Sequence, residues 1–126
     1  MRLLALFLVL VSMSLRCTGA SAQDATKGAQ LFNLCAACHA KDQTNRLGPG
    51  LAGIVGRKSA SVSGFRYSRA MANANIVWDE QALDAYIAAP QKVVPGNLMA
   101  FSGIADPNRR ADLIAFLETL KLASNP

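Results

Sequence analysis

The motif Cys35-Ala-Ala-Cys38-His39 constrains this chain more than any other feature. The two cysteines are three residues apart, and a histidine directly follows the second. His39 is the only histidine in the chain, and the only other cysteine is Cys17, close to the N-terminus. Three kinds of site contain such a pair: a redox-active dithiol, half of a zinc site, or an attachment site for haem.

The spacing matches the attachment motif of c-type haem. Two thiols one turn apart can add to the two vinyl groups on one edge of the porphyrin, and His39 is then delivered beneath the iron as an axial ligand. A thioredoxin-like dithiol needs a βαβ context, and zinc needs four ligands. The motif therefore predicts one haem c, bound through Cys35 and Cys38, with the dithiol and zinc sites as alternatives.

The first 22 residues have the layout of a secretory signal peptide. Arg2 precedes an apolar run over residues 3–11, and small residues lead to an A-x-A-like cleavage site after Ala22. The apolar run is shorter than a transmembrane span, and a signal anchor is the alternative. We expect a secretory signal peptide over residues 1–22 and one mature domain over residues 23–126, with no membrane anchor.

Charge and size limit what the mature domain can do. The chain has 13 Lys and Arg and 8 Asp and Glu, and Arg2 and Arg16 lie in the expected leader, so the mature net charge is +3. This excess is too small for a typical nucleic-acid-binding protein. A domain of roughly 100 residues has a modest core. Its two remaining cysteines could close only a short disulfide loop, so a non-peptide core is expected.

Helical signals lie at both ends of the mature chain. Asp24 is a candidate N-cap for a helix from about Ala25 into the cysteine pair. Asp106 and Pro107 suit the N-cap and first position of a last helix that carries an apolar stripe. These two segments are expected to supply much of the protein core.

The middle of the chain is largely irregular. Residues 39–76 are rich in glycine and show no strand alternation, although a short helix can start at Ser68. Asp79 suits the N-cap of a further helix, which Pro90 should stop before a second irregular stretch. Irregular segments of this length are uncommon in small domains unless they are functional. They would suit the wrapping of a large, flat, apolar group.

A methionine is the expected second axial ligand. The absence of another histidine excludes bis-histidine ligation in a monomer, and the mature chain contains only Met71 and Met99. Met71 lies in a short helical piece that suits packing, whereas Met99 follows Pro95 and Gly96 in a loop that can turn a thioether inward. We therefore favour Met99, with Met71 as the alternative.

Over residues 24–122 the chain resembles the class I cytochromes c, most closely the bacterial and mitochondrial-like branch (c2-type). Seven short motifs carry this resemblance, and they follow one another in the family's order. They are G-x-x-x-F at Gly28 and Phe32, CAACH, GPGLAGIVGRK, SGFRYS, Trp78, VPGNLMAFSGI and RRADLIAFL. The resemblance implies an all-α cytochrome c fold, with three main helices, a short helix and long loops wrapped around one covalent haem. It also implies one-electron transfer without enzymatic activity.

The resemblance also assigns roles to residues around the haem. It implies that the Pro49 carbonyl accepts a hydrogen bond from Nδ1–H of His39 and so orients the imidazole. It implies that Arg57, Tyr67 and Trp78 donate hydrogen bonds toward a buried haem propionate, which needs such partners to stay ionised.

Further roles follow from the same resemblance. Tyr86 should approach the Met99 sulfur with its hydroxyl group, and Phe101 should lie over the haem edge. Gly28 and Phe116 should form the close crossing of the first and last helices. The last pair is structural, so changing it should reduce stability before it affects redox chemistry.

The chain departs from the family pattern in the loop before Met99. The family commonly has P-G-T-K-M, whereas residues 95–99 read P-G-N-L-M. The threonine and lysine that help to hold the second propionate are therefore missing, although Asn97 could still donate to it. Met71 stands where the mitochondrial pattern has an asparagine of the internal hydrogen-bond network.

The resemblance implies redox proteins as partners: a donor such as a bc1-type complex or a dehydrogenase, and an acceptor such as a terminal oxidase. With haem, the net charge falls to about +1 to +2, so electrostatic steering should be weak. Docking should use an apolar patch around Leu34, Ala36, Leu98 and Phe101, with Lys92 and Arg46 nearby. We expect a monomer in a bacterial periplasm; the alternatives are a permanently docked haem subunit and a gas- or peroxide-reactive protein with labile Met99.

Overall fold

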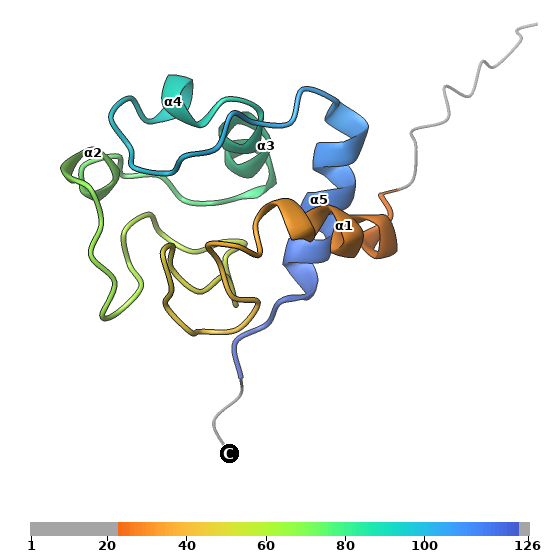
Figure 1. Cartoon of the computed structure of the whole chain (residues 1–126), viewed down its shortest axis with the longest axis horizontal. Helices are drawn as coiled ribbons and strands as arrows, with labels where there is room; N and C mark the ends of the chain where they lie inside the picture. The colour runs from red at the N-terminus through yellow and green to blue at the C-terminus, as the bar shows by residue number, and fades with distance from the viewer. Residues whose placement is uncertain (1–22, 124–126) are drawn as a thin grey trace, which may run out of the picture.

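A computed structural model describes residues 23–123. The expected leader and the Cys17 position lie outside these described residues. Helices alternate with long loops, and α1 and α5 cross at one side of the molecule while α2 and α4 lie toward the other (Figure 1). Among the described residues the only β pairing is an isolated antiparallel bridge between Lys58 and Val77. The predicted all-α architecture is confirmed.

The first helix runs into the cysteine motif, as predicted. Helix α1 spans Ala25–Leu31, and the 3-10 helix η1 continues it over Phe32–Leu34. The Asp24 carboxylate caps α1 by accepting hydrogen bonds from the backbone N–H groups of Thr26 and Lys27, at 2.9 and 3.2 Å. These bonds satisfy N–H groups that have no partner inside the helix.

Helix α5 (Pro107–Thr119) crosses α1 at the predicted glycine. A β-carbon at Gly28 would overlap the Asp112 carbonyl and the β-carbon of Phe116, so only glycine permits this approach. Phe32 is 1% exposed and packs edge-on against Phe116, with ring centroids 5.5 Å apart. The predicted crossing of Gly28 and Phe116 is confirmed.

Helix α3 (Glu80–Ala88) is capped by Asp79, as predicted, and buries Leu83, Tyr86 and Ile87. Pro90 ends it but also begins a short helix, α4 (Pro90–Val93). The sequence predicts Pro90 only as a stop and gives no helix here, and the irregular stretch expected from Val93 is wrong for that residue alone. Proline can begin a helix because it lacks an N–H and its fixed φ suits a first helical turn.

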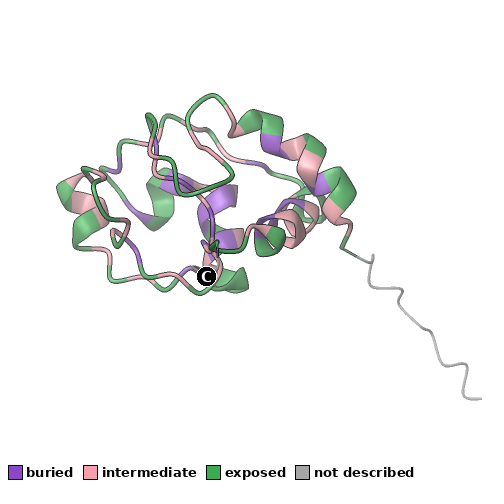
Figure 2. Cartoon of the chain, turned by 90° about the horizontal axis from the view of Figure 1, so that it is seen from below, coloured by how far each residue is buried: buried purple, intermediate pink, exposed green. Residues whose placement is uncertain are grey.

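The long segment between η1 and α3 contains only α2 (Arg69–Ala72), which Ser68 caps by accepting from the Met71 N–H. Ser59 fastens this segment, since its N–H donates to the Ile76 carbonyl and its hydroxyl accepts from the Ile76 N–H. Buried residues lie toward the middle of the molecule and the outer loops are mainly exposed or half-buried (Figure 2). Within residues 23–123, no helix has both the length and the apolar character to cross a membrane.

Candidate functional site

Both cysteines of the motif are free thiols on one turn of chain. The N–H groups of Cys38 and His39 both donate to the Cys35 carbonyl, at 3.1 and 2.9 Å. Cys38 is exposed and Cys35 is partly buried, and burial raises the pKa of the Cys35 thiol, with a smaller effect from Cys38. The turn therefore offers two reduced sulfurs beside one imidazole.

The imidazole of His39 is held by the segment that follows it. Its Nδ1 lies 2.8 Å from the Pro49 carbonyl oxygen, so the predicted hydrogen bond is present. Burial lowers the pKa of His39, opposed by the Pro49 bond and assisted by the charge of Arg57. A neutral ring that donates from Nδ1 keeps a lone pair on Nε2, which is the atom that can bind a metal.

Gly48 forms a cradle for this ring. A β-carbon at Gly48 would overlap Cε1, Nδ1 and Nε2 of His39, and the Gly48 N–H donates to the Cys38 carbonyl at 2.9 Å. Arg46 closes the same turn, because its Nη1 donates to the Ala36 carbonyl at 2.9 Å. From the sequence, Gly48 is only part of the GPGLAGIVGRK motif, and the absence of space for a side chain explains why glycine stands there.

Arg57 and Tyr67 lie close to the site but are partly engaged by backbone. Nη1 of Arg57 donates to the carbonyls of Gly50 and Ala52, at 3.1 and 3.0 Å. Burial lowers the pKa of Arg57, and Tyr67 opposes the shift. The Tyr67 hydroxyl accepts from the Val62 N–H at 3.3 Å and keeps its own proton to donate. Their predicted role toward a propionate stays a prediction.

Trp78 and Tyr86 pack together, with ring centroids 4.8 Å apart, and are 6% and 8% exposed. Burial raises the pKa of Tyr86 to about 12, so its phenol remains a donor. Neither Trp78 Nε1 nor Tyr86 Oη has a hydrogen-bond partner in the protein within residues 23–123. Every fully buried side-chain nitrogen or oxygen in this part of the chain does have a partner, so these two atoms are not fully buried. Both donors are therefore free to meet a bound polar group.

The two methionines are both half-buried and pack against the core, as does Phe101. Met99 donates its N–H to the Asn97 side chain at 2.9 Å, and its carbonyl accepts from the Phe101 N–H. The structure records no hydrogen bond from Tyr86 to the Met99 sulfur within the described residues, so that contact stays a prediction. The choice of Met99 over Met71 as ligand also stays a prediction.

The expectation that Asn97 could donate to a propionate is wrong in this structure. Asn97 is 6% exposed, and its Nδ2 donates to the carbonyls of Pro90 and Val94, at 3.1 and 2.8 Å. Both amide protons are thus used inside the protein. The Asn97 side chain also accepts from the Met99 N–H. The sequence does contain a signal for this bond, since asparagine commonly bonds to the backbone two residues later.

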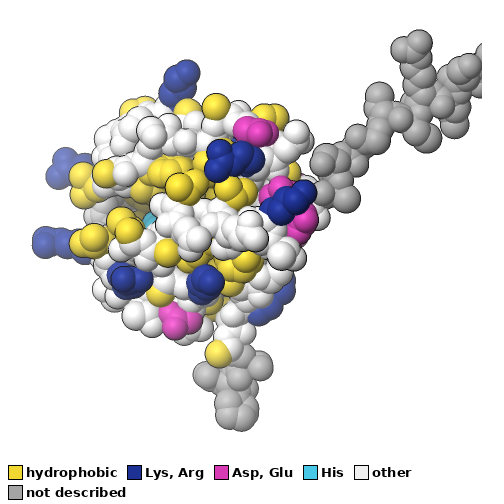
Figure 3. Space-filling model, turned by 45° about the vertical axis from the view of Figure 1, so that its right-hand side comes forward, with side chains coloured by type: hydrophobic (Ala, Val, Ile, Leu, Met, Phe, Trp, Pro, Cys, Tyr) yellow, Lys and Arg dark blue, Asp and Glu magenta, His cyan; other side chains and the backbone are white. Residues whose placement is uncertain are grey.

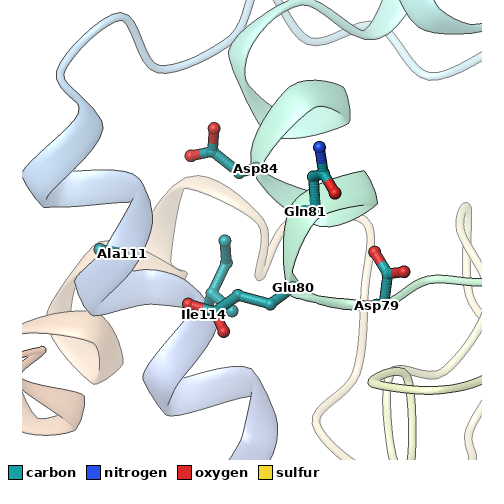
Figure 4. A pocket seen from close by; sticks show the side chains of 6 residues that line it. All are labelled: Asp79, Glu80, Gln81, Asp84, Ala111 and Ile114. Atoms are coloured by element: carbon teal, nitrogen blue, oxygen red, sulfur yellow. The ribbon is translucent and has the colours of Figure 1, made fainter.

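A separate hollow between α3 and α5 contains none of the predicted site residues (Figure 4). Its lining includes three carboxylates that already have structural partners. Asp79 caps α3, Glu80 accepts from Gln23 at 2.8 Å, and Asp84 pairs with Arg110. Across residues 23–123, no group of three or more His, Cys, Asp or Glu side chains is arranged to hold a metal ion.

These residues fit haem c. The two free thiols share a turn with the imidazole, Gly48 leaves room for that ring, and Trp78 and Tyr86 present unpaired donors. The fold and site therefore define a small all-α protein with one covalently attached haem.

Comparisons with known proteins agree with this class. The family model "Cytochrome c" matches residues 25–121. The chain is 51% identical over 85 residues to cytochrome c of Trypanosoma brucei brucei, which covers 68% of this chain and 91% of that protein. It is 46% identical over 100 residues to cytochrome c2 of Rhodopila globiformis, covering 78% of this chain and 94% of that protein.

A solved structure also matches. Cytochrome cH from Methylobacterium extorquens superposes with a TM-score of 0.74 at 40% identity, covering 76% of this chain and 98% of that one. The chain belongs to the cytochrome c family, whose members carry electrons with a c-type haem. Its haem is attached through Cys35 and Cys38, which occupy the family's CxxCH positions.

Proposed function

We propose that this protein is a one-electron carrier, not an enzyme, in which His39 and Met99 are the axial ligands of haem c. The observation that carries the proposal is the hydrogen bond from His39 Nδ1 to the Pro49 carbonyl. It fixes the imidazole on the turn of both thiols and leaves Nε2 as its ligand atom. When bound, haem c supplies an iron atom that gains or loses a single electron.

The side chains around the site favour electron transfer over catalysis. Met99 provides a soft thioether donor, which favours the lower oxidation state of a bound metal, and the buried shell around Trp78 and Tyr86 acts in the same direction. Arg57 and Tyr67 would join Trp78 in donating to a propionate. If His39 and Met99 both held the metal, no coordination position would remain open for a substrate.

The axial pair can be tested by optical spectroscopy of the purified oxidised and reduced protein, together with a pyridine haemochrome. Met99→Ala should leave the haem attached but abolish the low-spin spectrum of histidine–methionine ligation, whereas Met71→Ala should retain it. The reverse result would assign the ligand to Met71. Colourless protein with two titratable thiols after export and maturation would overturn the whole proposal.

Residues 1–22 are proposed to direct export and to be removed. The layout of this segment and the similarity to cytochromes c2 support a monomer that works in a bacterial periplasm. Its donor would be a bc1-type complex or a dehydrogenase, and its acceptor a terminal oxidase. Intact mass of protein from a periplasmic fraction should correspond to a chain that begins at Gln23, and an uncleaved chain in the membrane fraction would contradict this.

The proposed docking patch is apolar. Leu34 is 52% and Leu98 is 82% exposed, while Ala36 and Phe101 are half-buried. On the face that Figure 3 shows, Lys and Arg side chains are scattered and do not form one cluster. Electron transfer to a partner should therefore depend only weakly on ionic strength.

The same exposed leucines favour a second candidate, a haem subunit fixed to a dehydrogenase or oxidase, because large exposed apolar side chains mark interaction surfaces. Size-exclusion chromatography of native periplasmic extract, followed at the haem absorbance, separates the two. A carrier elutes at the size of the free chain, whereas a subunit co-elutes with a larger complex.

A further inference from the structure

Asn97 is a buried polar residue in an exposed loop. It is 6% exposed, although its neighbours Gly96 and Leu98 are exposed, the latter to 82%. This loop follows α4 at the top of Figure 1 and leads directly to Met99. A buried amide needs hydrogen-bond partners, because an unpaired one costs free energy on burial.

Every polar group of Asn97 has such a partner. Its Nδ2 donates to the carbonyls of Pro90 and Val94, and its backbone N–H donates to Val94 as well, at 3.1 Å. Its Oδ1 accepts from the Met99 N–H at 2.9 Å. The reverse amide orientation would place Oδ1 against two carbonyl oxygens, so this network fixes which atom faces Met99.

Gln91 adds a second tie from α4 to the same loop. Its Nε2 donates to the Asn97 carbonyl at 2.9 Å, and its Oε1 accepts from the Gly96 N–H at 3.2 Å. Pro90, one of the most deeply buried residues of the chain, fixes the start of α4 beneath both ties. The backbone that carries Met99 is thus fastened at successive residues to a short helix whose first residue is buried.

From these contacts we infer that Asn97 and Gln91 are positioning residues that retain Met99 at the metal and so keep small exogenous ligands away from it. The inference rests on the proposed role of Met99 as an axial ligand. For the thioether to leave, the segment at Met99 must move away from α4, which breaks the bond to Asn97 Oδ1 and strains those of Gln91. These hydrogen bonds would therefore hinder the binding of gases or peroxide that a labile Met99 would allow.

The test is a titration of the oxidised holoprotein with imidazole, which competes with Met99 for the metal and is followed optically. We expect the Kd for imidazole to fall about fivefold in Gln91→Ala and about tenfold in Asn97→Ala. These factors correspond to about 1 to 1.5 kcal/mol of lost hydrogen bonding. Gln91 is exposed, so Gln91→Ala still decides the question if Asn97→Ala does not fold.

Two control variants separate positioning from general stability. Gln81→Ala makes the same change at an exposed residue of α3 that has no hydrogen bond to the loop within the described residues, and it should bind imidazole like the wild type. Asp112→Ala removes the acceptor for the Asp24 N–H, far along the chain from the loop. It should lower the unfolding temperature without changing the Kd for imidazole.

Failure of this inference can be told apart from failure of the axial assignment. If Met99→Ala binds imidazole no more tightly than the wild type, Met99 is not the ligand and both proposals are overturned. If Met99→Ala binds it much more tightly but Gln91→Ala and Asn97→Ala match the wild type, the positioning role alone is overturned. The positioning role alone is also overturned if Asp112→Ala lowers the Kd for imidazole as much as Gln91→Ala and Asn97→Ala do.

Discussion

His39 Nδ1 and the Pro49 carbonyl oxygen lie 2.8 Å apart, and Gly48, the residue directly before Pro49, leaves no room for a β-carbon beside the imidazole ring. The hydrogen bond and the missing side chain act together, because the ring can reach the carbonyl only where no β-carbon stands in its way. The orientation of a metal-binding imidazole is commonly set by such a bond. A two-residue stretch therefore controls the direction of Nε2.

Gly48→Ala should displace the His39 ring and weaken its bond to Pro49. The added β-carbon would overlap three ring atoms, and overpacking of this kind costs about 1–3 kcal/mol. We expect a lower yield of haem-loaded protein, a lower free energy of unfolding and an altered low-spin spectrum. Optical spectra and urea unfolding of the purified variant measure all three.

Gly56→Ala is the matched control for this change. Gly56 has a φ of +84° but nothing within 4 Å of an added β-carbon. Alanine there should cost about 1–2 kcal/mol of backbone strain and leave the haem spectrum as it is. Equal spectra for Gly48→Ala and the wild type would show that the cradle does not orient the ring.

Gly28→Ala should destabilise the protein without changing its spectrum. In a free helix this substitution stabilises by about 1 kcal/mol. Here the β-carbon would overlap the Asp112 carbonyl across the α1–α5 crossing, so we expect a loss of about 3 kcal/mol instead. Thermal unfolding gives the sign directly, and an increase in stability would mean that the two helices separate at no cost.

Capping signals made the helices predictable from the sequence. Asp24, Asp79 and Asp106 each bond to N–H groups two or three residues later, and a contact of that range is encoded locally. The short helix at Pro90 could not be separated from a turn, because a single helical turn has almost no periodicity. The internal bonds of Asn97 were missed for a related reason, since its burial depends on how α4 packs.

The candidate site was predictable to a different extent. The CxxCH spacing alone indicated the attachment turn, because its chemistry lies within five residues. The contact between His39 and Pro49, and the nearness of Arg57 to Tyr67, came from family resemblance. No local pattern contains them, since they depend on how an irregular loop folds back on itself.

Arg110 should contribute more to stability than its partner Asp84. Their atoms Nε and Oδ1 lie 2.6 Å apart, but the Arg110 side chain is 12% exposed and also donates to the carbonyls of Ile104 and Ala105. We expect Arg110→Ala to cost about 2–3 kcal/mol and Asp84→Ala about 1 kcal/mol. Urea unfolding of both variants and of the double variant measures the difference, and equal losses would show that the two carbonyl bonds contribute nothing.

The Asp24 cap should make stability depend on pH in acid. Hydrogen bonds from the N–H groups of Lys27 and Thr26 lower the pKa of Asp24 below its ordinary value of 3.8 in the folded state, with the bond from Lys27 as the largest cause. Its stabilisation is therefore complete above the unfolded pKa and is lost as the pH falls through the folded pKa. Asn keeps an acceptor for the cap but cannot titrate.

Asp24→Asn should therefore flatten the acid side of the stability curve, most clearly between about pH 5 and pH 2, the range in which a capping carboxylate takes up its proton. Thermal unfolding of the wild type and of Asp24→Asn, followed by far-UV circular dichroism over a series of pH values, measures the two stability curves. Glu118→Gln is the control, because Glu118 is exposed and its side chain makes no hydrogen bond within residues 23–123. A wild-type curve that matches Asp24→Asn across this range would show that the Asp24 charge adds nothing to the cap, since the difference between the variants isolates the carboxylate from its role as an acceptor.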